Sequence, residues 1–286
     1  MTIAITGASG SLGRATAELV LKTVDPRGVV LTTRRPENLA DLAGAGAEVR
    51  HADFSDPASL TEAFSGVERL LLISTDAVGA RVDQHRAAIA AATAAGVGHI
   101  VYTSVPEPVP GNPAIVVPDH AATEAALRAS SATWTFLRNN LYSELQIAGV
   151  QAALASGTLP SNTGTGGAAY VSREDCAAVA AAMLTQDGHA GRIYDVTGPV
   201  AVRSADLAAL AGALGGRDVE LVDMDDAGFA AQLRGLGLPD GAVELVVSFG
   251  AATRDGFLST ATNIVEELTG HHPIPTADVV RRALGR

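Results

Sequence analysis

Three glycines recur at every third position near the start of the chain, at Gly7, Gly10 and Gly13, between a short apolar segment and an amphipathic one. A strand, a glycine-rich turn and a helix in this order form a site where the phosphates of a dinucleotide bind at the helix N-terminus. Gly7 permits the tight turn, Gly10 lets the backbone approach a pyrophosphate, and Gly13 lets the helix pack on the strand. The sequence therefore predicts a phosphate-binding loop made by Gly7, Ser9, Gly10, Ser11, Leu12 and Gly13.

Two other interpretations of this loop were weighed against phosphate binding. The nucleophile elbow of a hydrolase, Gly-x-Ser-x-Gly, is excluded because Ser11 stands where its second glycine would be. An ordinary glycine-rich turn stays open, but the strand before the loop and the helix after it favour phosphate binding.

The predicted second strand ends in Thr33, Arg34 and Arg35, with no carboxylate at its tip. An acidic residue at this position accepts a hydrogen bond from the ribose 2′-hydroxyl of NAD, whereas the planar guanidinium of arginine suits the 2′-phosphate of NADP. We therefore expect NADP as the cofactor, with NADPH preferred over NADH. Arg34 is expected to bind the phosphate, supported by Thr33 and Arg35; a solvated arginine pair is the structural alternative.

Polar residues also follow the other predicted strands, at the edge where an open α/β sheet binds its ligands. Asp53 and Phe54 follow the third strand and are expected beside the adenine ring, and Ser74 and Thr75 follow the fourth strand next to them. The fifth and sixth strands add three further cofactor-binding candidates, Thr103, Ser104 and Asn139.

Alternating strand and helix signals position these residues in the first half of the chain. The expected strands are 2–6, 29–33, 48–51, 69–73, 99–103 and 134–137. The expected helices are 13–22, 57–64, 81–95 and one that Asp119 caps and that runs to about Ala129. Parallel strands joined by helical crossovers form a sheet with helices on both faces. The predicted fold class is therefore α/β, a Rossmann-like doubly wound parallel sheet with a smaller mixed C-terminal substrate subdomain.

The second half of the chain has a looser pattern. Its expected helices are 140–157, 176–184, 204–214, 225–234, 241–246, 260–268 and 277–284, and its expected strand is 193–196. We predict an NADP-binding Rossmann-like domain at residues 1–140 and a substrate or lid subdomain at residues 141–286. A return of the chain to the sheet stays open.

The composition bounds the class of protein. Of the 286 residues 47% are apolar, and the net charge of -11 argues against attraction to nucleic acid or to an anionic membrane surface. Cys176 is the only cysteine, and the seven histidines show no metal-ligand spacing. No apolar run approaches the roughly 20 residues that span a bilayer. We therefore expect a cytoplasmic protein without a nucleic-acid or membrane partner, and a homodimer stays open.

The chain resembles the NmrA-like atypical short-chain dehydrogenase/reductases, and among them the type 2 NAD(P)H:quinone oxidoreductases and the triphenylmethane reductases. Beside the glycine loop, the segments that carry this resemblance are 70–74, 102–104, His120 with Thr123 and Glu124, 136–139 and 142–144. The last two contain the pattern Arg-Asn-x-x-Tyr-Ser-Glu, which is more specific than the loop. The similarity covers nearly the whole chain, and it implies a Rossmann-like fold, an NADP cofactor and an aromatic or quinone acceptor.

The Tyr-x-x-x-Lys dyad of the familiar short-chain dehydrogenases cannot form in this chain. Lys22 is the only lysine, and the residues four places after the four tyrosines are Pro106, Gln146, Glu174 and Gly198. A quinone needs little general-acid help, because its reduction gives an aromatic hydroquinone. The protein must then chiefly supply the proximity of cofactor and acceptor.

The catalytic candidates are His120 and Tyr102. Imidazole titrates near neutrality, so His120 is suited to stabilise a developing oxyanion or to relay a proton; a structural histidine at a helix start is the alternative. Tyr102 lies near the end of the fifth strand, and a structural role for it stays equally open. After the sixth strand, Asn139 is the candidate for an amide contact to nicotinamide or substrate, and Asn140 and Tyr142 are the candidates for substrate binding.

The sequence thus predicts an NADPH-dependent oxidoreductase that transfers hydride to a quinone or a similar small aromatic acceptor. One alternative is the reducing component of an oxygen-dependent hydroxylation of a polycyclic, anthraquinone-type aromatic in secondary metabolism. Another is a non-catalytic NADP(H)-sensing regulator that acts through a protein partner, because the acidic charge disfavours direct contact with DNA.

Overall fold

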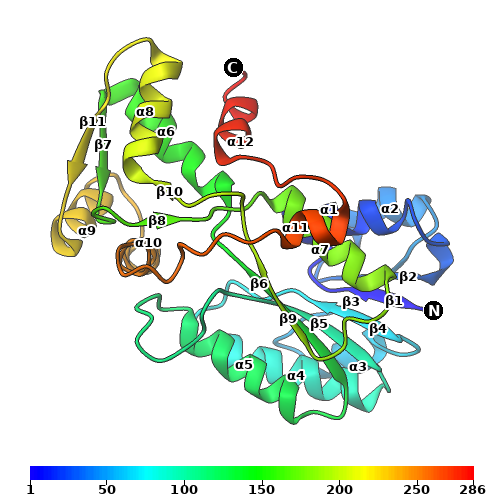
Figure 1. Cartoon of the computed structure of the whole chain (residues 1–286). Helices are drawn as coiled ribbons and strands as arrows, with labels where there is room; N and C mark the ends of the chain where they lie inside the picture. The colour runs from blue at the N-terminus through cyan, green and yellow to red at the C-terminus, as the bar shows by residue number, and fades with distance from the viewer. The chain divides into compact units, whose positions relative to one another are not determined.

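A seven-stranded sheet organises the computed structural model, which describes residues 1–286 (Figure 1). The strands lie in the order β3-β2-β1-β4-β5-β6-β9. In chain order they are β1 (Ile3–Ile5), β2 (Val29–Thr33), β3 (Glu48–His51), β4 (Arg69–Leu72), β5 (His99–Ser104), β6 (Thr133–Asn139) and β9 (Arg192–Val196). The ladders from β3 through to β6 are parallel. The predicted doubly wound, Rossmann-like sheet is confirmed, and β9 extends it beside β6.

Helices cover both faces of this sheet. On one face lie α1 (Ser11–Val20) and α7 (Arg173–Thr185), and on the other lie α3 (Pro57–Ala63), α4 (Arg81–Ala94) and α5 (Val117–Ala129) (Figure 1). The strands are therefore buried on both sides, which explains why β1, β2 and β4 read as continuous apolar runs rather than alternating ones. Two 3₁₀ turns, η1 (Pro26–Gly28) and η2 (Pro36–Leu39), flank β2. The short helix α2 (Ala40–Gly44) comes directly after η2.

The strand order reverses beside β1, and this point fixes where a ligand can bind. From β1 the chain moves outward to β2 and β3, and then returns to β4 on the other side of β1. In open α/β sheets, ligands bind outside the carboxyl ends of the strands at such a reversal. The segments that leave these carboxyl ends begin at Thr6 after β1 and at Ile73 after β4.

The chain divides into two compact units. The first comprises residues 1–105, 119–138 and 173–195, and the second comprises residues 106–118, 139–172 and 196–286. The assignment of residues 1–140 to cofactor binding and of residues 141–286 to substrate binding stays a prediction.

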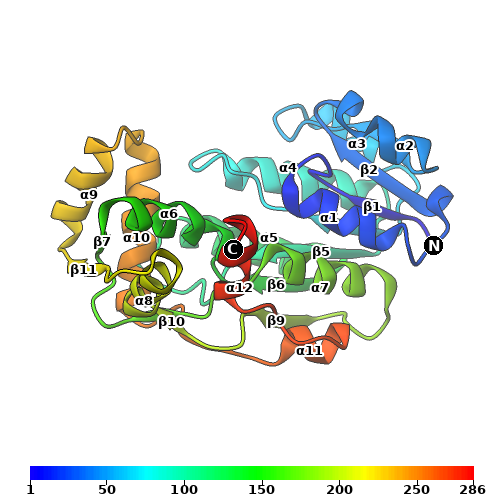
Figure 2. The ribbon, with the colours of Figure 1, turned by 90° about the horizontal axis from the view of Figure 1, so that it is seen from above.

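The second unit has its own small sheets and its own core. Its elements are η3 (Ser143–Leu145), α6 (Gln146–Ser156), β7 (Thr158–Ser161), β8 (Gly167–Ala168), β10 (Val202–Arg203), α8 (Ser204–Gly215), β11 (Glu220–Asp223), α9 (Asp226–Gly235), α10 (Asp240–Arg254), α11 (Ile264–Thr269) and α12 (Thr276–Ala283). Strand β7 pairs in parallel with β11, and β8 pairs antiparallel with β10. Helices α6, α8 and α12 enclose an apolar core that includes Val150, Leu207 and Val280, and α9 packs beside α10 (Figure 2).

Several expected helix starts are wrong, among them those of α7, which begins at Arg173 rather than at residue 176, and of α11, which begins at Ile264 rather than at residue 260. Helix α5 begins at Val117, so Asp119 lies inside its first turn and does not cap it. The helix expected from residue 140 begins only at Ser143 as a 3₁₀ turn, because residues 140–142 are held extended. The backbone N–H of Asn140 donates to the carbonyl of Val196, and Val171 bonds to the backbone on both sides of Tyr142.

The length of α10 and the four short strands of the second unit also escaped prediction. Helix α10 continues to Arg254, well beyond the expected residue 246. Gly250 lies inside it, where an added Cβ would stand 1.8 Å from the side-chain oxygen of Asn162. The glycine therefore serves a close approach and does not end the helix. None of the chain's helices combines the length and the apolar composition that a membrane crossing requires.

Candidate active site

The loop between β1 and α1 has the geometry that its glycines predict. Gly7 adopts a φ of 59°, which only glycine takes without strain. The backbone N–H of Gly10 donates to the carbonyl of Gly7 at 2.9 Å and closes the turn. At Gly13 an added Cβ would stand 2.4 Å from that same carbonyl oxygen. The first turn of α1 therefore sits directly against the loop, and a side chain at position 13 would force the two apart.

The N-terminus of α1 offers free donors beside this turn. Its N-cap is Gly10, and no side chain caps the helix. The N–H groups of the first helical turn have no carbonyl within the helix to bond, and the helix dipole adds positive potential there. Leu12 is buried and anchors the turn in the core, whereas Ser9 and Ser11 are exposed. This arrangement suits a phosphate or pyrophosphate group.

The end of β2 is joined to the glycine loop through Thr33. The hydroxyls of Ser9 and Thr33 share a hydrogen bond of 2.8 Å, and the backbone N–H of Arg35 donates to the Thr33 hydroxyl at 3.2 Å. The side chains of Arg34 and Arg35 are exposed and form no ion pair. Their guanidinium groups are therefore free to bind an anion beside the loop.

The segments after β3 and β4 are tied together by helix α4. Gln84 accepts a hydrogen bond from the hydroxyl of Thr75 at 2.8 Å and donates to the hydroxyl of Ser55 at 3.0 Å. Ser55 in turn donates its backbone N–H to the carboxylate of Asp53. Phe54 is half-buried. The sequence did not single out Gln84, although it holds in place the two segments expected at the adenine ring.

The end of β5 belongs to a second network, which converges on the buried carboxylate of Glu124. The hydroxyl of Ser104 donates to Glu124 at 2.7 Å, and the guanidinium groups of Arg138 and Arg128 bond to the same carboxylate at 2.9 and 3.1 Å. Beside it, the hydroxyl of Thr103 accepts the backbone N–H of Ser74 at 2.9 Å and so joins β5 to the segment after β4. The side chains of Thr103 and Ser104 thus hold the sheet edge in shape.

Asn139 is the last residue of β6 and Asn140 follows it, and their side chains differ in hydrogen bonding. The side chain of Asn139 is 7% exposed, and neither its amide nitrogen nor its amide oxygen has a partner. Asn140 is 3% exposed, donates to the carbonyl of Leu258 at 3.0 Å and accepts the backbone N–H of Leu141 at 2.8 Å. The amide of Asn140 is therefore committed within the fold, whereas that of Asn139 lacks what a buried amide requires. Tyr142 is half-buried in the extended segment that follows.

Tyr102 and His120 are paired in the interior. Tyr102 has no exposed surface and points toward the α4 and α5 side of the sheet, where its hydroxyl lies 2.8 Å from Nδ1 of His120. Burial raises the pKa of the Tyr102 phenol. Burial, with the positive charge of Arg81, lowers the pKa of His120 to about 3. The expectation that His120 titrates near neutrality is therefore wrong, because its ring is withdrawn from water and stays neutral.

Helix α4 contributes two buried residues that the sequence did not mark. Arg81 donates from Nε to the carbonyl of Thr75 at 2.6 Å and lies 3.7 Å from the carboxylate of Asp119. His85, one helical turn later, accepts the backbone N–H of Thr75 at 3.2 Å. Their spacing of four residues on a predicted helix places them on one face, which is the only signal that could have found them.

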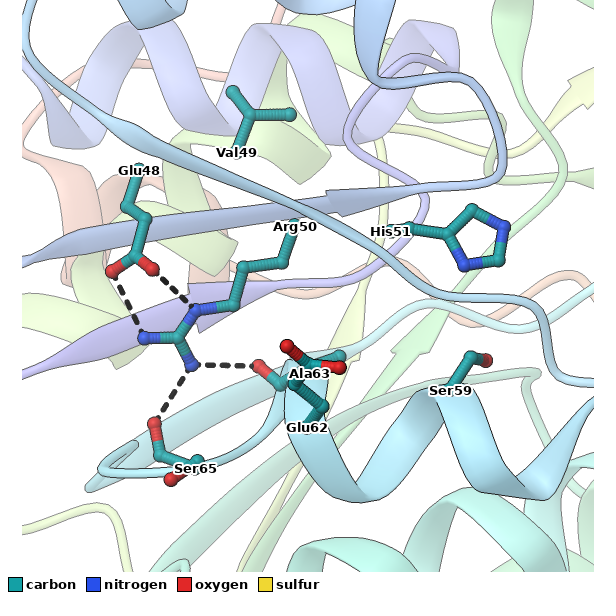
Figure 3. A pocket seen from close by; sticks show the side chains of 8 residues that line it. All are labelled: Glu48, Val49, Arg50, His51, Ser59, Glu62, Ala63 and Ser65. Atoms are coloured by element: carbon teal, nitrogen blue, oxygen red, sulfur yellow. Dashed lines mark hydrogen bonds and ion pairs between the residues drawn. The ribbon is translucent and has the colours of Figure 1, made fainter.

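A hollow of about 530 Å³ lies elsewhere on the first unit, between β3 and α3 (Figure 3). Arg50 crosses it and is held by the carboxylate of Glu48 and by the carbonyls of Ala63 and Ser65. No residue of the glycine loop and none of the other predicted site residues lines this hollow. Its arginine is fully engaged, so the hollow does not compete with the sheet edge as the candidate site.

The residues at the sheet edge fit a phosphorylated dinucleotide. The loop leaves no room for a side chain at Gly13, the α1 N-terminus supplies free donors, and Arg34 supplies an unpaired positive charge. Asn139 adds an amide that can both donate and accept, as a carboxamide requires. The loop, the N-terminus of α1 and Arg34 can together hold the phosphates of such a dinucleotide at the carboxyl edge of the sheet.

Comparison with known proteins agrees with this geometry. Residues 7–187 match a family described as NAD(P)H-binding. Quinone oxidoreductase 2 of Escherichia coli (strain K12) is 39% identical to this chain over 97% of both. The crystal structure of the NADPH-dependent quinone oxidoreductase of Escherichia coli complexed with NADPH has a TM-score of 0.95 at 38% identity and covers 99% of this chain and 100% of that one. The triphenylmethane reductase of Citrobacter sp. complexed with NADP(H) has a TM-score of 0.91 at 30% identity, with 99% and 100% covered.

Proposed function

The chain belongs to the NAD(P)H-binding family, and we propose that it is an NADPH-dependent oxidoreductase that reduces a quinone or a similar aromatic acceptor. The observation that carries this proposal is the close packing of the glycine loop. A Cβ added at Gly13 would stand 2.4 Å from the carbonyl oxygen of Gly7. The named activities of two similar proteins, a quinone oxidoreductase and a triphenylmethane reductase, support an aromatic acceptor.

The residues of the site divide the work of holding the cofactor. The backbone of the loop and the first turn of α1 bind the pyrophosphate, and Arg34 binds the 2′-phosphate and so selects NADPH over NADH. Asn139 meets the carboxamide with its free amide and fixes which face of the nicotinamide is presented. Bound NADPH supplies a hydride; the protein supplies orientation, without a Tyr-Lys dyad.

The test is to mix the purified protein with NADPH and a panel of quinones and to follow the loss of nicotinamide absorbance. We expect turnover with at least one quinone and weaker turnover with NADH. A protein that binds NADPH and reduces no quinone or related aromatic would refute the proposal and favour the sensing role. Products that incorporate oxygen only in aerated samples would instead indicate a hydroxylation system.

A further inference from the structure

The tautomer of His85 follows from its hydrogen bonds and provides a reference for its neighbour. The hydroxyl of Thr123 donates to the carbonyl of Asp119 at 2.8 Å, so that hydroxyl must accept from Nδ1 of His85 at 2.9 Å. On the other side of the ring, Nε2 accepts the backbone N–H of Thr75. His85 is therefore neutral, carries its proton on Nδ1, and has both nitrogens satisfied.

The same reasoning gives His120 the opposite tautomer. Its Nδ1 faces the hydroxyl of Tyr102 at 2.8 Å, and its Nε2 makes no hydrogen bond within the chain. The hydroxyls of Ser74 and Thr123 also interact with the phenol, but its hydrogen-bond partner at 2.8 Å is Nδ1 of His120, and Thr123 sends its own proton to Asp119. If Nδ1 of His120 carried the proton, the buried phenol would have no acceptor for its own. A buried donor without an acceptor is costly, so the phenol donates to Nδ1 and Nε2 keeps the proton.

The groups that face His120 keep its ring neutral. Helix α4 contributes Arg81 and His85, β5 contributes Tyr102, and α5 itself contributes Asp119 and Glu124. Burial disfavours an imidazolium most, and the positive charge of Arg81 adds to this effect; a protonated His85 would act in the same direction. The ring thus stays a neutral imidazole with one N–H group that has no partner in the protein.

We infer that Tyr102 holds His120 as the Nε2–H tautomer, so that His120 offers a neutral N–H donor to the oxygen of the acceptor. His120 lies in the first turn of α5, with its ring 5.8 Å from that of Tyr102 near the carboxyl end of β5. A fixed, desolvated donor stabilises negative charge as it develops on the acceptor oxygen. Tyr102 is then a positioning residue and does not touch the acceptor.

This assignment also settles the source of the proton. Reduction of a quinone to a hydroquinone takes up one hydride, which comes from NADPH, and one proton. His120 has a single ring proton and keeps it as a hydrogen-bond donor, so the proton added to the product comes from water. The role toward the acceptor depends on the proposed function, whereas the tautomer does not.

The tautomer is tested on the intact protein labelled with ¹⁵N-histidine, by long-range ¹H–¹⁵N correlation spectra. Between about pH 5 and pH 8, we expect neither His85 nor His120 to titrate, with Nδ1–H for His85 and Nε2–H for His120. Burial lowers the pKa of His99 to about 4, so its signals also stay constant in this range. The variant His120→Gln assigns the signals of His120 by removing them. A His120 that carries its proton on Nδ1, or that titrates in this pH range, would overturn the inference.

The donor role is tested by steady-state kinetics with a quinone from the panel that the protein reduces. In Tyr102→Phe the ring is retained and only the donor to Nδ1 is lost, so we expect kcat to fall about fivefold to tenfold with KM for NADPH unchanged. His120→Gln keeps a neutral N–H donor and should retain more activity than His120→Leu. Equal losses in these two variants, or a kcat that changes through pH 6.5 in the wild type as ordinary histidine would, would overturn the role. If the spectra agree and no quinone is reduced, the tautomer stands and only the proposed function fails.

Discussion

Replacement of Asn139 by leucine is expected to stabilise the protein while it weakens cofactor binding. Asn139 is 7% exposed and both polar atoms of its amide lack partners. A buried donor or acceptor without a partner costs about 1–3 kcal/mol, because its bonds to water are not replaced. A buried group in this state calls for an explanation, and a contact to a ligand is the one that this replacement tests.

The size of the effect follows from the two unpartnered atoms. Leucine has nearly the shape of asparagine and places apolar atoms where the amide stood. We therefore expect the free energy of unfolding of the unliganded Asn139→Leu variant to rise by about 1–3 kcal/mol. NADPH at a hundred times its dissociation constant adds about 2.7 kcal/mol to the wild type by mass action. The variant should gain much less at the same concentration, since it has lost the amide contact.

The assay is urea unfolding with and without NADPH, combined with calorimetric titration of NADPH. Asn140→Leu is the matched control, because its amide already bonds to the carbonyl of Leu258 and to the N–H of Leu141. Removal of that amide leaves the N–H of Leu141 without a partner and leaves the carbonyl of Leu258 with the N–H of Ala169 alone, and it should cost about 1–3 kcal/mol. The two variants should thus change stability in opposite directions.

Two results would refute this reasoning. If unliganded Asn139→Leu is less stable than the wild type, the amide has partners that the structure does not show. If the variant is stabilised by NADPH as strongly as the wild type, Asn139 does not bind the cofactor.

Three further predictions address the loop, the cofactor preference and pH. Arg34→Ala should leave the free energy of unfolding unchanged, because Arg34 has no ion pair. Calorimetry should show that the variant binds NADPH about 10–100-fold more weakly and NADH as tightly as the wild type. Equal losses of affinity for both cofactors would contradict the role of Arg34. Gly13→Ala should abolish NADPH binding and lower Tm, because its methyl group would stand 2.4 Å from the carbonyl oxygen of Gly7. The control Gly44→Ala, where nothing lies within 4 Å of the added methyl group, should change neither. A Gly13→Ala variant that still binds NADPH would contradict the role of the glycine loop. Burial lowers the pKa of His85 and of His120 to about 3 from 6.5, so the unfolded chain binds more protons below pH 6.5 and stability falls as pH drops. By pH 5 each should cost about 2 kcal/mol in urea unfolding, and His120→Gln should lose its share of that dependence; a wild-type stability that does not change would contradict the buried neutral rings.

The parts of the site that depend on local sequence were predictable. The glycine loop needs only a strand, a turn and a helix in succession, and its three glycines stand where φ or close packing requires them. The buried strands of the sheet are apolar runs bounded by turns, and so their order and type could be inferred. Strands β8 and β10 have two residues each, too few to show an alternating pattern, and they form only because the second unit brings them together.

The parts that depend on burial were not predictable. Tyr102 stands next to residues of the sheet edge in the sequence, but alternation along β5 turns its side chain into the core, beside Phe136 and His85. Nothing in the local sequence perturbs the pKa of His120; it is lowered because the fold buries the ring and because α4 brings the positive charge of Arg81 near it. A sequence shows which residues can titrate; the surrounding dielectric decides whether they do.

Asn139 and Asn140 show that the surroundings of a side chain in the fold, and not its type, decide whether it has hydrogen-bond partners. They are identical side chains on adjacent residues, and alternation at the end of β6 sends them in opposite directions. One direction meets the carbonyl of Leu258, more than a hundred residues away, and the other meets no polar atom of the chain. No sequence pattern separates the two, because the difference lies in what the rest of the fold places opposite each amide. The buried amide of Asn139, left without partners, is the reason we propose this residue and not Asn140 as a ligand contact, and the opposite stability changes predicted for the two leucine variants follow directly from that difference.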